Sequence, residues 1–310
     1  MLTRPPRLRD GARIGVVSPS YWIEPERLAR AIGVFENAGY DMVVGPSVGM
    51  RQDKFAGSPK ARAHDIMTMF ADETIDAILC ARGGYGANRV LPLLDYELIR
   101  KHPKIFCGFS DVTGLLSSIS QRSGLVTFHG PMLTNWGRET IDWNLETFRR
   151  VLSGEHGVRI DSAPGCEARV LRPGIARGPL WGGNLSLVIE RLGTPWRIET
   201  SGAVLMLEEI DERLHAFDRM MQQLRASGTL DGVAGLVLGE LLEMKDTDPS
   251  FGRSAEEIVM DACEGLDFPV IANFPCGHGA CQATLPIGHD VELNADEHSP
   301  FIMVSGAPVT

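Results

Sequence analysis

A single serine, Ser110, stands between an apolar run and a helical pattern, and this spacing suits nucleophilic chemistry. Residues 105–109 predict a buried strand, and residues 112–119 predict the helix that follows it. Gly108 lies two residues before the serine, as in the G-x-S-x-G nucleophile elbow, although Val112 replaces the second glycine. The same residues also fit a serine that merely caps a helix. The interpretation therefore depends on whether the chain supplies a base, an orienting acid and oxyanion donors.

Two of the eight histidines are candidates for the general base. His278 follows an apolar strand pattern and lies between Gly277 and Gly279, which let the backbone approach a ligand closely. His129 ends another predicted strand, so it would share a sheet edge with Ser110. Of the two, we favour His278 and keep His129 as the competitor.

Acidic residues follow the apolar strand 204–207, and they include a candidate that would orient the base. Glu208 comes directly after this strand, so its carboxylate is placed to project into a cleft. Asp211 and Glu212 instead fit the common enrichment of acids in the first turn of a helix. The neighbouring Glu209 leaves a one-residue ambiguity in the assignment.

The loop Arg82-Gly-Gly-Tyr-Gly86 follows the third predicted strand and matches neither the dinucleotide fingerprint nor a Walker loop. Its paired glycines let backbone N–H groups face a cleft. We therefore expect the N–H of Asp111, at the start of the next helix, and that of Gly84 or its neighbour to act as oxyanion donors. Arg82 suits a substrate carboxylate, because a guanidinium group binds carboxylates bidentately.

One segment near the end of the chain combines cysteine and histidine at the short spacing typical of metal sites. Cys276-x-His278-x-x-Cys281 has the donor types of a zinc site, but zinc needs three or four ligands and no second Cys/His pair stands at a useful spacing. Cys80 and Cys107 lie in apolar strand patterns and are predicted to be buried thiols. The sequence therefore predicts neither a metal nor a cofactor.

Alternating strand and helix patterns fill residues 1–153 and predict the first domain. Strands separated by helices of about 12 residues form βαβ units, and hence a parallel, doubly wound α/β sheet. Ligands of such sheets bind beyond the carboxyl ends of the strands, where both the 82–86 loop and Ser110 fall. The strands are expected near residues 12–19, 40–44, 75–81, 105–109 and 125–129.

Residues 154–179, rich in glycine, proline and charge, predict a linker or domain crossover. Residues 180–310 form the second predicted domain, with a β-rich end. This domain opens with a segment that predicts a loop running into a helix. Within it, Trp181 and Asn184 are candidates for substrate stacking and amide recognition, with plain packing as the equal alternative.

Composition narrows the classes of partner. The chain of 310 residues is 44% hydrophobic and 23% charged, and its formal charge is −10. A negative charge of this size argues against a nucleic acid or an anionic membrane surface as the main partner. Residues 1–10 lack the apolar core of a signal peptide, and no run reaches membrane-spanning length. We therefore expect a cytoplasmic protein.

Six segments in the same order along the chain resemble the LD-carboxypeptidase family of serine peptidases, which includes muropeptide-recycling enzymes and microcin-immunity hydrolases. The resemblance covers nearly the whole chain, and the order of the segments makes it specific. They are Ile14-Gly-Val-Val-Ser-Pro-Ser, Ala81-Arg-Gly-Gly-Tyr-Gly, Gly108-Phe-Ser-Asp-Val-Thr, Trp181-Gly-Gly-Asn-Leu-Ser, Leu207-Glu-Glu with Phe217-Asp-Arg, and Gly277-His-Gly with Leu285-Pro-Ile-Gly.

The resemblance implies a Ser-Glu-His triad of Ser110, Glu208 and His278, without a metal. It implies a flavodoxin-like N-terminal domain that carries Ser110 and a β-rich C-terminal domain that carries the other two residues. The implied substrate is a cell-wall tetrapeptide, cleaved before its terminal D-Ala, and the implied assembly is a homodimer. An immunity-type hydrolase of aminoacyl-nucleotide amides and a non-catalytic peptide-binding protein are the alternatives.

Overall fold

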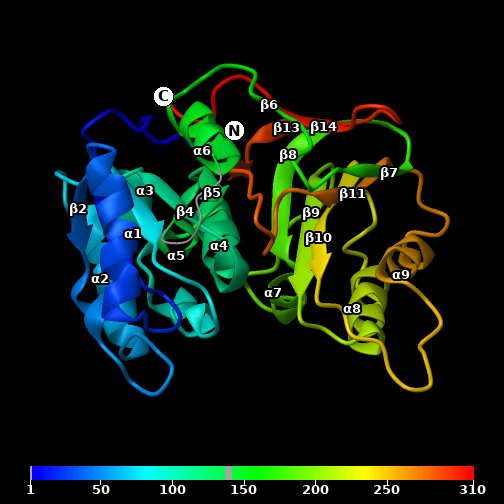
Figure 1. Cartoon of the computed structure of the whole chain (residues 1–310), viewed down its shortest axis with the longest axis horizontal. Coiled ribbons are helices and arrows are strands. Elements are labelled where there is room, and N and C mark those ends of the chain that lie inside the picture. The colour runs from blue at the N-terminus through cyan, green and yellow to red at the C-terminus, as the bar shows by residue number, and fades with distance from the viewer. Residues whose placement is uncertain (1, 137–141) are drawn as a thin grey trace. The chain divides into compact units, whose positions relative to one another are not determined.

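The computed structural model describes residues 2–136 and 142–310, which divide into two compact units (Figure 1). Unit 1 contains the N-terminal part of the chain and two later segments that return to it. Unit 2 contains the rest. Unit 1 comprises Met1–Val158, Ala283–His289 and Gly306–Thr310, and unit 2 comprises Arg159–Gln282 and Asp290–Ser305.

Unit 1 is built on a six-stranded sheet with the order β12-β5-β4-β3-β1-β2. The five N-terminal strands are parallel in the order 2-1-3-4-5 of flavodoxin-like sheets, so the predicted doubly wound sheet is confirmed. A strand from the far end of the chain, β12, adds antiparallel to β5. The strands are β1 (Arg13–Val17), β2 (Asp41–Val44), β3 (Ala77–Cys80), β4 (Ile105–Gly108), β5 (Thr127–His129) and β12 (Leu285–Ile287).

Local signals explain where the helices of unit 1 begin and end. Proline stands in the first turn of α1 and α2, and Ser58 caps α2 by accepting a hydrogen bond from the N–H of Ala61 at 3.2 Å. Gly124, with φ 71°, ends α4. The helices are α1 (Pro25–Asn37), α2 (Pro59–Ala71), α3 (Tyr96–Lys101), α4 (Thr113–Ser123), α5 (Leu133–Trp136) and α6 (Asp142–Leu152), with 3₁₀ turns η1 (Pro46–Gly49), η2 (Ala87–Arg89), η3 (Leu91–Leu93) and η4 (Ser110–Val112).

Unit 2 is built on an eight-stranded sheet with the order β6-β14-β13-β8-β9-β10-β11-β7. Strands β8 to β11 run parallel, and antiparallel strands flank them. The strands are β6 (Arg159–Ile160), β7 (Arg169–Arg172), β8 (Gly174–Asn184), β9 (Val204–Ile210), β10 (Gly235–Leu242), β11 (Val270–Phe274), β13 (Asp290–Ala295) and β14 (Phe301–Val304). The helices are α7 (Leu185–Glu190), α8 (Leu214–Ala226) and α9 (Ala255–Ala262).

The segment before α7 differs from its sequence-based interpretation. The predicted loop at 180–184 is the end of strand β8, and residues 154–179 contain β6, β7 and the start of β8. Gly182 and Gly183 have φ values of 123° and 132°, and a Cβ at Gly182 would lie 1.8 Å from the carbonyl oxygen of Met206 in β9. Paired glycines usually indicate a loop, but here they allow two neighbouring strands to approach closely.

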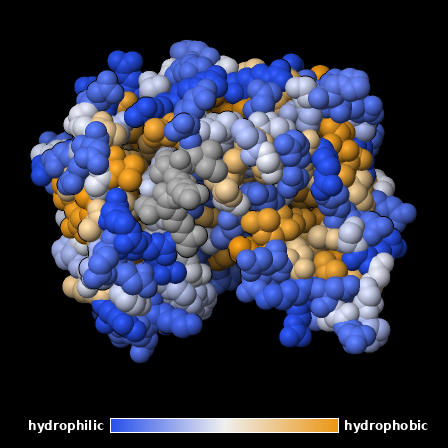
Figure 2. Space-filling view, viewed as in Figure 1, coloured by the Kyte–Doolittle hydropathy of each residue, from blue (hydrophilic) through white to orange (hydrophobic). Residues whose placement is uncertain are grey.

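Apolar side chains fill the interior of each unit, and all six cysteines are free and buried. The predicted burial of Cys80 and Cys107 is confirmed, since both are 0% exposed. Figure 2 shows a mostly hydrophilic face interrupted by separate apolar patches. Throughout residues 2–136 and 142–310, every helix is too short or too polar to cross a lipid bilayer.

Candidate active site

Ser110 occupies a strained turn at the carboxyl end of β4. Its φ is 59°, a left-handed conformation that a non-glycine residue adopts at a cost of about 1–3 kcal/mol. The turn continues through η4 into α4, which is the strand-turn-helix arrangement of a nucleophile elbow. Gly108 permits it, because a Cβ there would lie 3.0 Å from Val112 and 3.1 Å from Cys80. The geometry is thus that of an elbow, although the second motif glycine is missing.

The glycine loop passes directly against this serine. A Cβ at Gly83 would lie 3.1 Å from both the Cβ and the Oγ of Ser110. Gly84, the predicted oxyanion donor, has φ 122°, and a Cβ there would lie 2.3 Å from the ring of Tyr21. Arg82 donates a hydrogen bond from Nη1 to the carbonyl oxygen of Trp22 at 3.2 Å. The loop therefore needs its glycines for close approach, to Ser110 on one side and to an aromatic ring on the other.

Two buried charged residues, Asp111 and Arg62, tie the loops around Ser110 together. Oδ2 of Asp111, 2% exposed, accepts hydrogen bonds from Oγ of Ser20 at 2.5 Å and from N–H of Ala87 at 2.8 Å. Arg62, 1% exposed, donates from Nη1 to the carbonyl oxygens of Gly86, at 3.0 Å, and of Pro19. The loops after β1, β3 and β4 are thereby fixed to one another.

Sequence reasoning considered only the backbone N–H of Asp111 and did not consider Arg62. An arginine on a predicted helix normally projects into solvent. Nothing in the local pattern indicated that this one is buried among loop carbonyls.

The competing base, His129, lies inside unit 1. It is 0% exposed, pairs with Leu285 of β12 in the sheet, and its ring packs edge-on against Phe109 with centroids 5.8 Å apart. A side chain enclosed in this way has no open path to a substrate. His129 thus ends β5 at the same sheet edge as Ser110, as expected, since it pairs with Gly108 of β4, but its ring is buried there.

In unit 2, the end of β9 and the turn after β11 bring Glu208 and His278 together. Oε2 of Glu208 lies 2.7 Å from Nδ1 of His278, and the Glu208 side chain is fully buried. This is the contact expected between a catalytic histidine and the carboxylate that orients it. Ser110, Gly84, Arg82 and Asp111 belong to unit 1, whereas Glu208, His278, Trp181 and Asn184 belong to unit 2.

Glu209, the other candidate acid, makes different contacts. Adjacent side chains of a strand point to opposite faces. Glu209 accepts hydrogen bonds from Nδ2 of Asn184 at 2.9 Å and from N–H and Oγ of Ser186, at 2.9 and 2.7 Å. It thus anchors the start of α7. The two acids are distinguished by their partners: Glu208 contacts the histidine, and Glu209 contacts a helix.

The turn that carries His278 is held by buried polar groups. Gly279 donates its N–H to Oε2 of Glu240 at 3.1 Å, and Gln282 donates from Nε2 to the carbonyl oxygen of Gly277 at 2.6 Å. A Cβ at Gly279 would lie 1.9 Å from Oε1 of Glu240, so the carboxylate fills the space that a side chain would need. Glu240, at the end of β10, was not singled out from the sequence, because an acid in an apolar strand carries no motif.

Burial and charge shift the acid–base properties of this group. Burial lowers the pKa of His278, but the hydrogen bond to Glu208 and the charges of Glu208, Glu209 and Glu240 raise that pKa more, to a net value above its ordinary range. Burial raises the pKa of Glu208, against the opposing effect of His278. Burial likewise raises the pKa of Glu240. The site therefore holds a histidine made more basic by buried carboxylates.

Trp181 and Asn184 are 8% and 4% exposed, so their contact with a substrate stays a prediction. Near His278, Cys276 is 0% and Cys281 4% exposed. In the part of the chain that the structure describes, no group of three or more His, Cys, Asp or Glu side chains is arranged to hold a metal ion.

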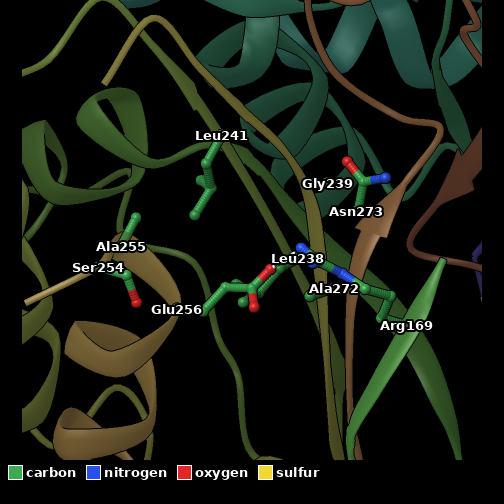
Figure 3. Close-up of a pocket in the computed structure, with 9 residues that line it drawn as sticks. All are labelled: Arg169, Leu238, Gly239, Leu241, Ser254, Ala255, Glu256, Ala272 and Asn273. Atoms are coloured by element: carbon green, nitrogen blue, oxygen red, sulfur yellow. Dashed lines mark hydrogen bonds and ion pairs between the residues drawn. The ribbon is translucent and has the colours of Figure 1, made fainter. Parts of the chain in front are cut away.

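A separate cavity of about 340 Å³ in unit 2 lies between β10, β11 and the start of α9 (Figure 3). Glu256 and Arg169 point toward one another across it and form an ion pair. Apart from the amide of Asn273, the remaining lining residues are apolar or small, and none of the predicted site residues takes part. We therefore do not assign the chemistry to this cavity.

Comparison with known proteins matches both units. The family described as the LD-carboxypeptidase N-terminal domain matches residues 14–130, and the one described as the LD-carboxypeptidase C-terminal domain matches residues 177–293. A probable murein peptide carboxypeptidase of Bacillus subtilis is 35% identical over 302 residues, 96% of this chain and 94% of that protein.

Two solved structures are similar along nearly their whole length. The muramoyltetrapeptide carboxypeptidase of Oxalobacter formigenes has a TM-score of 0.86 at 28% identity, over 96% of this chain and 100% of that one. The microcin C7 self-immunity protein MccF, known from Escherichia coli, has a TM-score of 0.90 at 25% identity in its wild-type apo state, over 99% and 100%.

Proposed function

This chain belongs to the LD-carboxypeptidase family of serine peptidases, and from that premise we propose that it removes the terminal D-Ala from cell-wall tetrapeptides. The observation that carries the proposal is the hydrogen bond of 2.7 Å between Nδ1 of His278 and buried Glu208. Because Nδ1–H is donated to the carboxylate, Nε2 carries the lone pair of the neutral imidazole, as a general base requires. The strained elbow at Ser110 supports it independently.

In the proposed reaction, Oγ of Ser110 attacks the carbonyl carbon of the residue before D-Ala, and its proton passes to Nε2 of His278. The C–N bond then breaks as His278 returns that proton to the leaving amine, and D-Ala departs. Water, activated by His278, hydrolyses the serine ester and restores the enzyme. Glu208 holds the imidazole in one tautomer and stabilises its cation.

The remaining predicted residues would bind and polarise the substrate. Backbone N–H groups of Gly84 and Asp111 hold the oxyanion, and Arg82 binds the terminal carboxylate. Trp181 and Asn184 contact the peptide. Support comes from the position of the 82–86 loop, since Gly83 lies against Ser110. No step in this scheme uses a metal or a cofactor.

The second candidate is hydrolysis of an aminoacyl-nucleotide amide, which the likeness to the immunity protein MccF favours. It uses the same serine chemistry on a different leaving group. Removal of D-Ala from cell-wall tetrapeptides ranks first, because relatives named for murein peptides match the chain over nearly its whole length.

The cellular setting is part of the proposal. The enzyme would act in the cytoplasm on peptides recovered from the cell wall, and it would do so as a homodimer. Cell fractionation with an antibody against the chain tests the compartment. Light scattering during size-exclusion chromatography tests the assembly, and a mass equal to that of one chain at assay concentration would reject the dimer.

The direct test is to incubate the purified protein, in the presence of a chelator, with L-Ala-γ-D-Glu-meso-diaminopimelate-D-Ala and to measure free D-Ala by mass spectrometry. We expect release that disappears in Ser110→Ala and with a peptide that ends in L-Ala. If folded protein releases no D-Ala but cleaves an aminoacyl-nucleotide amide, the second candidate replaces the first.

A further inference from the structure

Besides buried Arg62, which lies over the ring of Phe55 at 5.2 Å, four cations gather around a group of aromatic rings in unit 1. Arg51 lies over the ring of Trp22 at 4.3 Å, and Arg82 and Lys54 lie over Tyr21 at 5.6 and 5.9 Å. Arg89 lies 5.4 Å from the centre of the Phe55 ring and 6.0 Å from that of Tyr85. We call Arg51, Lys54, Arg82 and Arg89 the cationic cluster.

This cluster adjoins the loop that covers the nucleophile. Gly83 lies against Ser110, and the next residue, Gly84, lies against the ring of Tyr21 that two of the cations share. The rings of Tyr21 and Phe55 contact each other edge-on, with centroids 5.9 Å apart, and an isolated bridge joins their backbones. Lys54, Arg82 and Arg89 therefore lie over the same pair of rings that the nucleophile loop contacts, and Arg51 lies over Trp22, the residue next to Tyr21.

The cluster is not neutralised by the protein. Within residues 2–136 and 142–310, none of its four members forms an ion pair with a carboxylate, and Asp53 is the one acid in the segment 51–55. Arginines elsewhere in unit 1 do form such pairs, for example Arg13 with Asp41 at 2.9 Å and Arg100 with Glu97 at 2.7 Å. The four cations thus carry positive charge, without a counter-ion in the described part of the chain, near the loop that contacts Ser110, and such a group is suited to bind an anion.

The geometry also leaves the cations able to bind. Stacking on a ring uses the face of a guanidinium group and restrains its orientation, while the N–H groups stay at its edge. In the described chain, the guanidinium groups of Arg51 and Arg89 donate to no protein acceptor. They are therefore oriented in advance for bidentate contact with a carboxylate.

We propose that Arg51, Lys54 and Arg89 form a second anion subsite, which binds a carboxylate of the substrate other than the terminal one that Arg82 takes. In a stem peptide, two further carboxylates are available: the α-carboxylate of the γ-linked D-Glu and the free carboxylate of diaminopimelate. The subsite thus selects anionic peptides over neutral ones. It rests on the proposed function, since it is part of the same site.

The test compares Arg51→Gln/Arg89→Gln with the wild type on three tetrapeptides: one unmodified, one amidated at D-Glu and one amidated at the free carboxylate of diaminopimelate. On the unmodified peptide, we expect the double variant to raise KM by about 10- to 100-fold with little change in kcat, as for a lost charge-assisted contact. On the peptide amidated at the carboxylate that the subsite binds, the two proteins should have the same KM. Arg9→Gln is the matched control, because it also removes an exposed arginine. Arg9 precedes the amino end of β1, whereas the 82–86 loop follows the carboxyl end of β3.

The outcomes separate this proposal from the proposed function. If the wild type releases D-Ala but the double variant behaves like Arg9→Gln, the subsite is wrong and the function stands. Equal loss on all three peptides also overturns the subsite, because it indicates a general defect. If the wild type releases no D-Ala from any peptide, the proposed function itself fails.

Discussion

Ser110 in unit 1 and the Glu208–His278 pair in unit 2 are held by different physical means. Unit 1 relies on the backbone: Ser110 sits at a positive φ of 59°, and glycines let a loop close over it. Unit 2 relies on buried charge: Glu208 is fully buried, and Glu240 is 8% exposed in the same region. One unit stores conformational strain, and the other stores unfavourable desolvation.

This difference indicates how each unit should respond to substitution. A strained turn is sensitive to which residue can adopt its backbone angles, and much less to pH. A buried cluster of acids is sensitive to any change of charge. The predictions below separate the two, because each alters one unit in a way that the other should not reproduce.

Ser110→Ala should have the largest effect, a loss of about 10⁴-fold or more in kcat, because it removes the attacking oxygen. Single-turnover release of D-Ala measures it. Ser117→Ala is the control, since Ser117 lies in the following helix and hydrogen-bonds to the carbonyl oxygen of Thr113 at 3.0 Å. Substantial remaining activity in folded Ser110→Ala would reject the nucleophile.

Glu208→Gln and Glu209→Gln form a matched pair on neighbouring positions of β9. We expect the first to lower kcat by about 10²- to 10⁴-fold, because the imidazole loses its orienting charge. The second should leave kcat much closer to that of the wild type but destabilise the fold by about 1–3 kcal/mol, since an amide mismatches the donors of Asn184 and Ser186. Kinetics and urea denaturation give both numbers. A reversed pattern would make Glu209 the triad acid.

The pH profile tests the buried charges directly. The base must be neutral to accept a proton, so kcat/KM falls as the pH drops through the apparent pKa of the Glu208–His278 pair. Because the pKa of His278 is raised, this acidic limb should lie above the ordinary histidine value of about 6.5. Glu240→Gln removes a charge that raises this pKa, and it should move the limb to lower pH. Exposed Glu243→Gln should not, and equal profiles would exclude Glu240 from tuning the base.

The smallest change that we expect is in stability, and it comes from the strain at Ser110. Ser110→Gly should abolish turnover and yet raise the free energy of unfolding by about 1 kcal/mol, because glycine adopts positive φ without steric cost. Ser117→Gly, the same change inside α4, should lower stability by about 1 kcal/mol or more. Thermal denaturation of both variants measures the contrast. Destabilisation by both would show that the elbow stores no strain.

The elements that have strong local signals could be predicted from the sequence. The parallel sheet followed from alternating periodicity, and the positions of Ser110 and His278 followed from an apolar strand meeting glycines. It did not find Arg62 or Glu240, because both are buried charged residues whose partners come from distant segments. The choice between Glu208 and Glu209 also needed coordinates, since only side-chain direction distinguishes them.

The mistaken expectations have a common cause. Gly182 and Gly183 were interpreted as a loop, although they allow strand pairing. His129 was considered as a base because it ends β5 beside Ser110, although its ring is 0% exposed and β12, some 150 residues later, pairs with its strand. In both cases the missing information was a neighbour far away in the chain.

Because β12 returns to unit 1, the coding sequences of the two units are interleaved. The chain passes between the units after Val158, Gln282, His289 and Ser305, so no single cut separates them. A gene fragment ending at Val158 would encode a sheet whose β5 edge is bare, and such edges recruit other chains. Neither unit is therefore encoded by one continuous stretch of the gene, and a truncation at any single point leaves at least one unit incomplete.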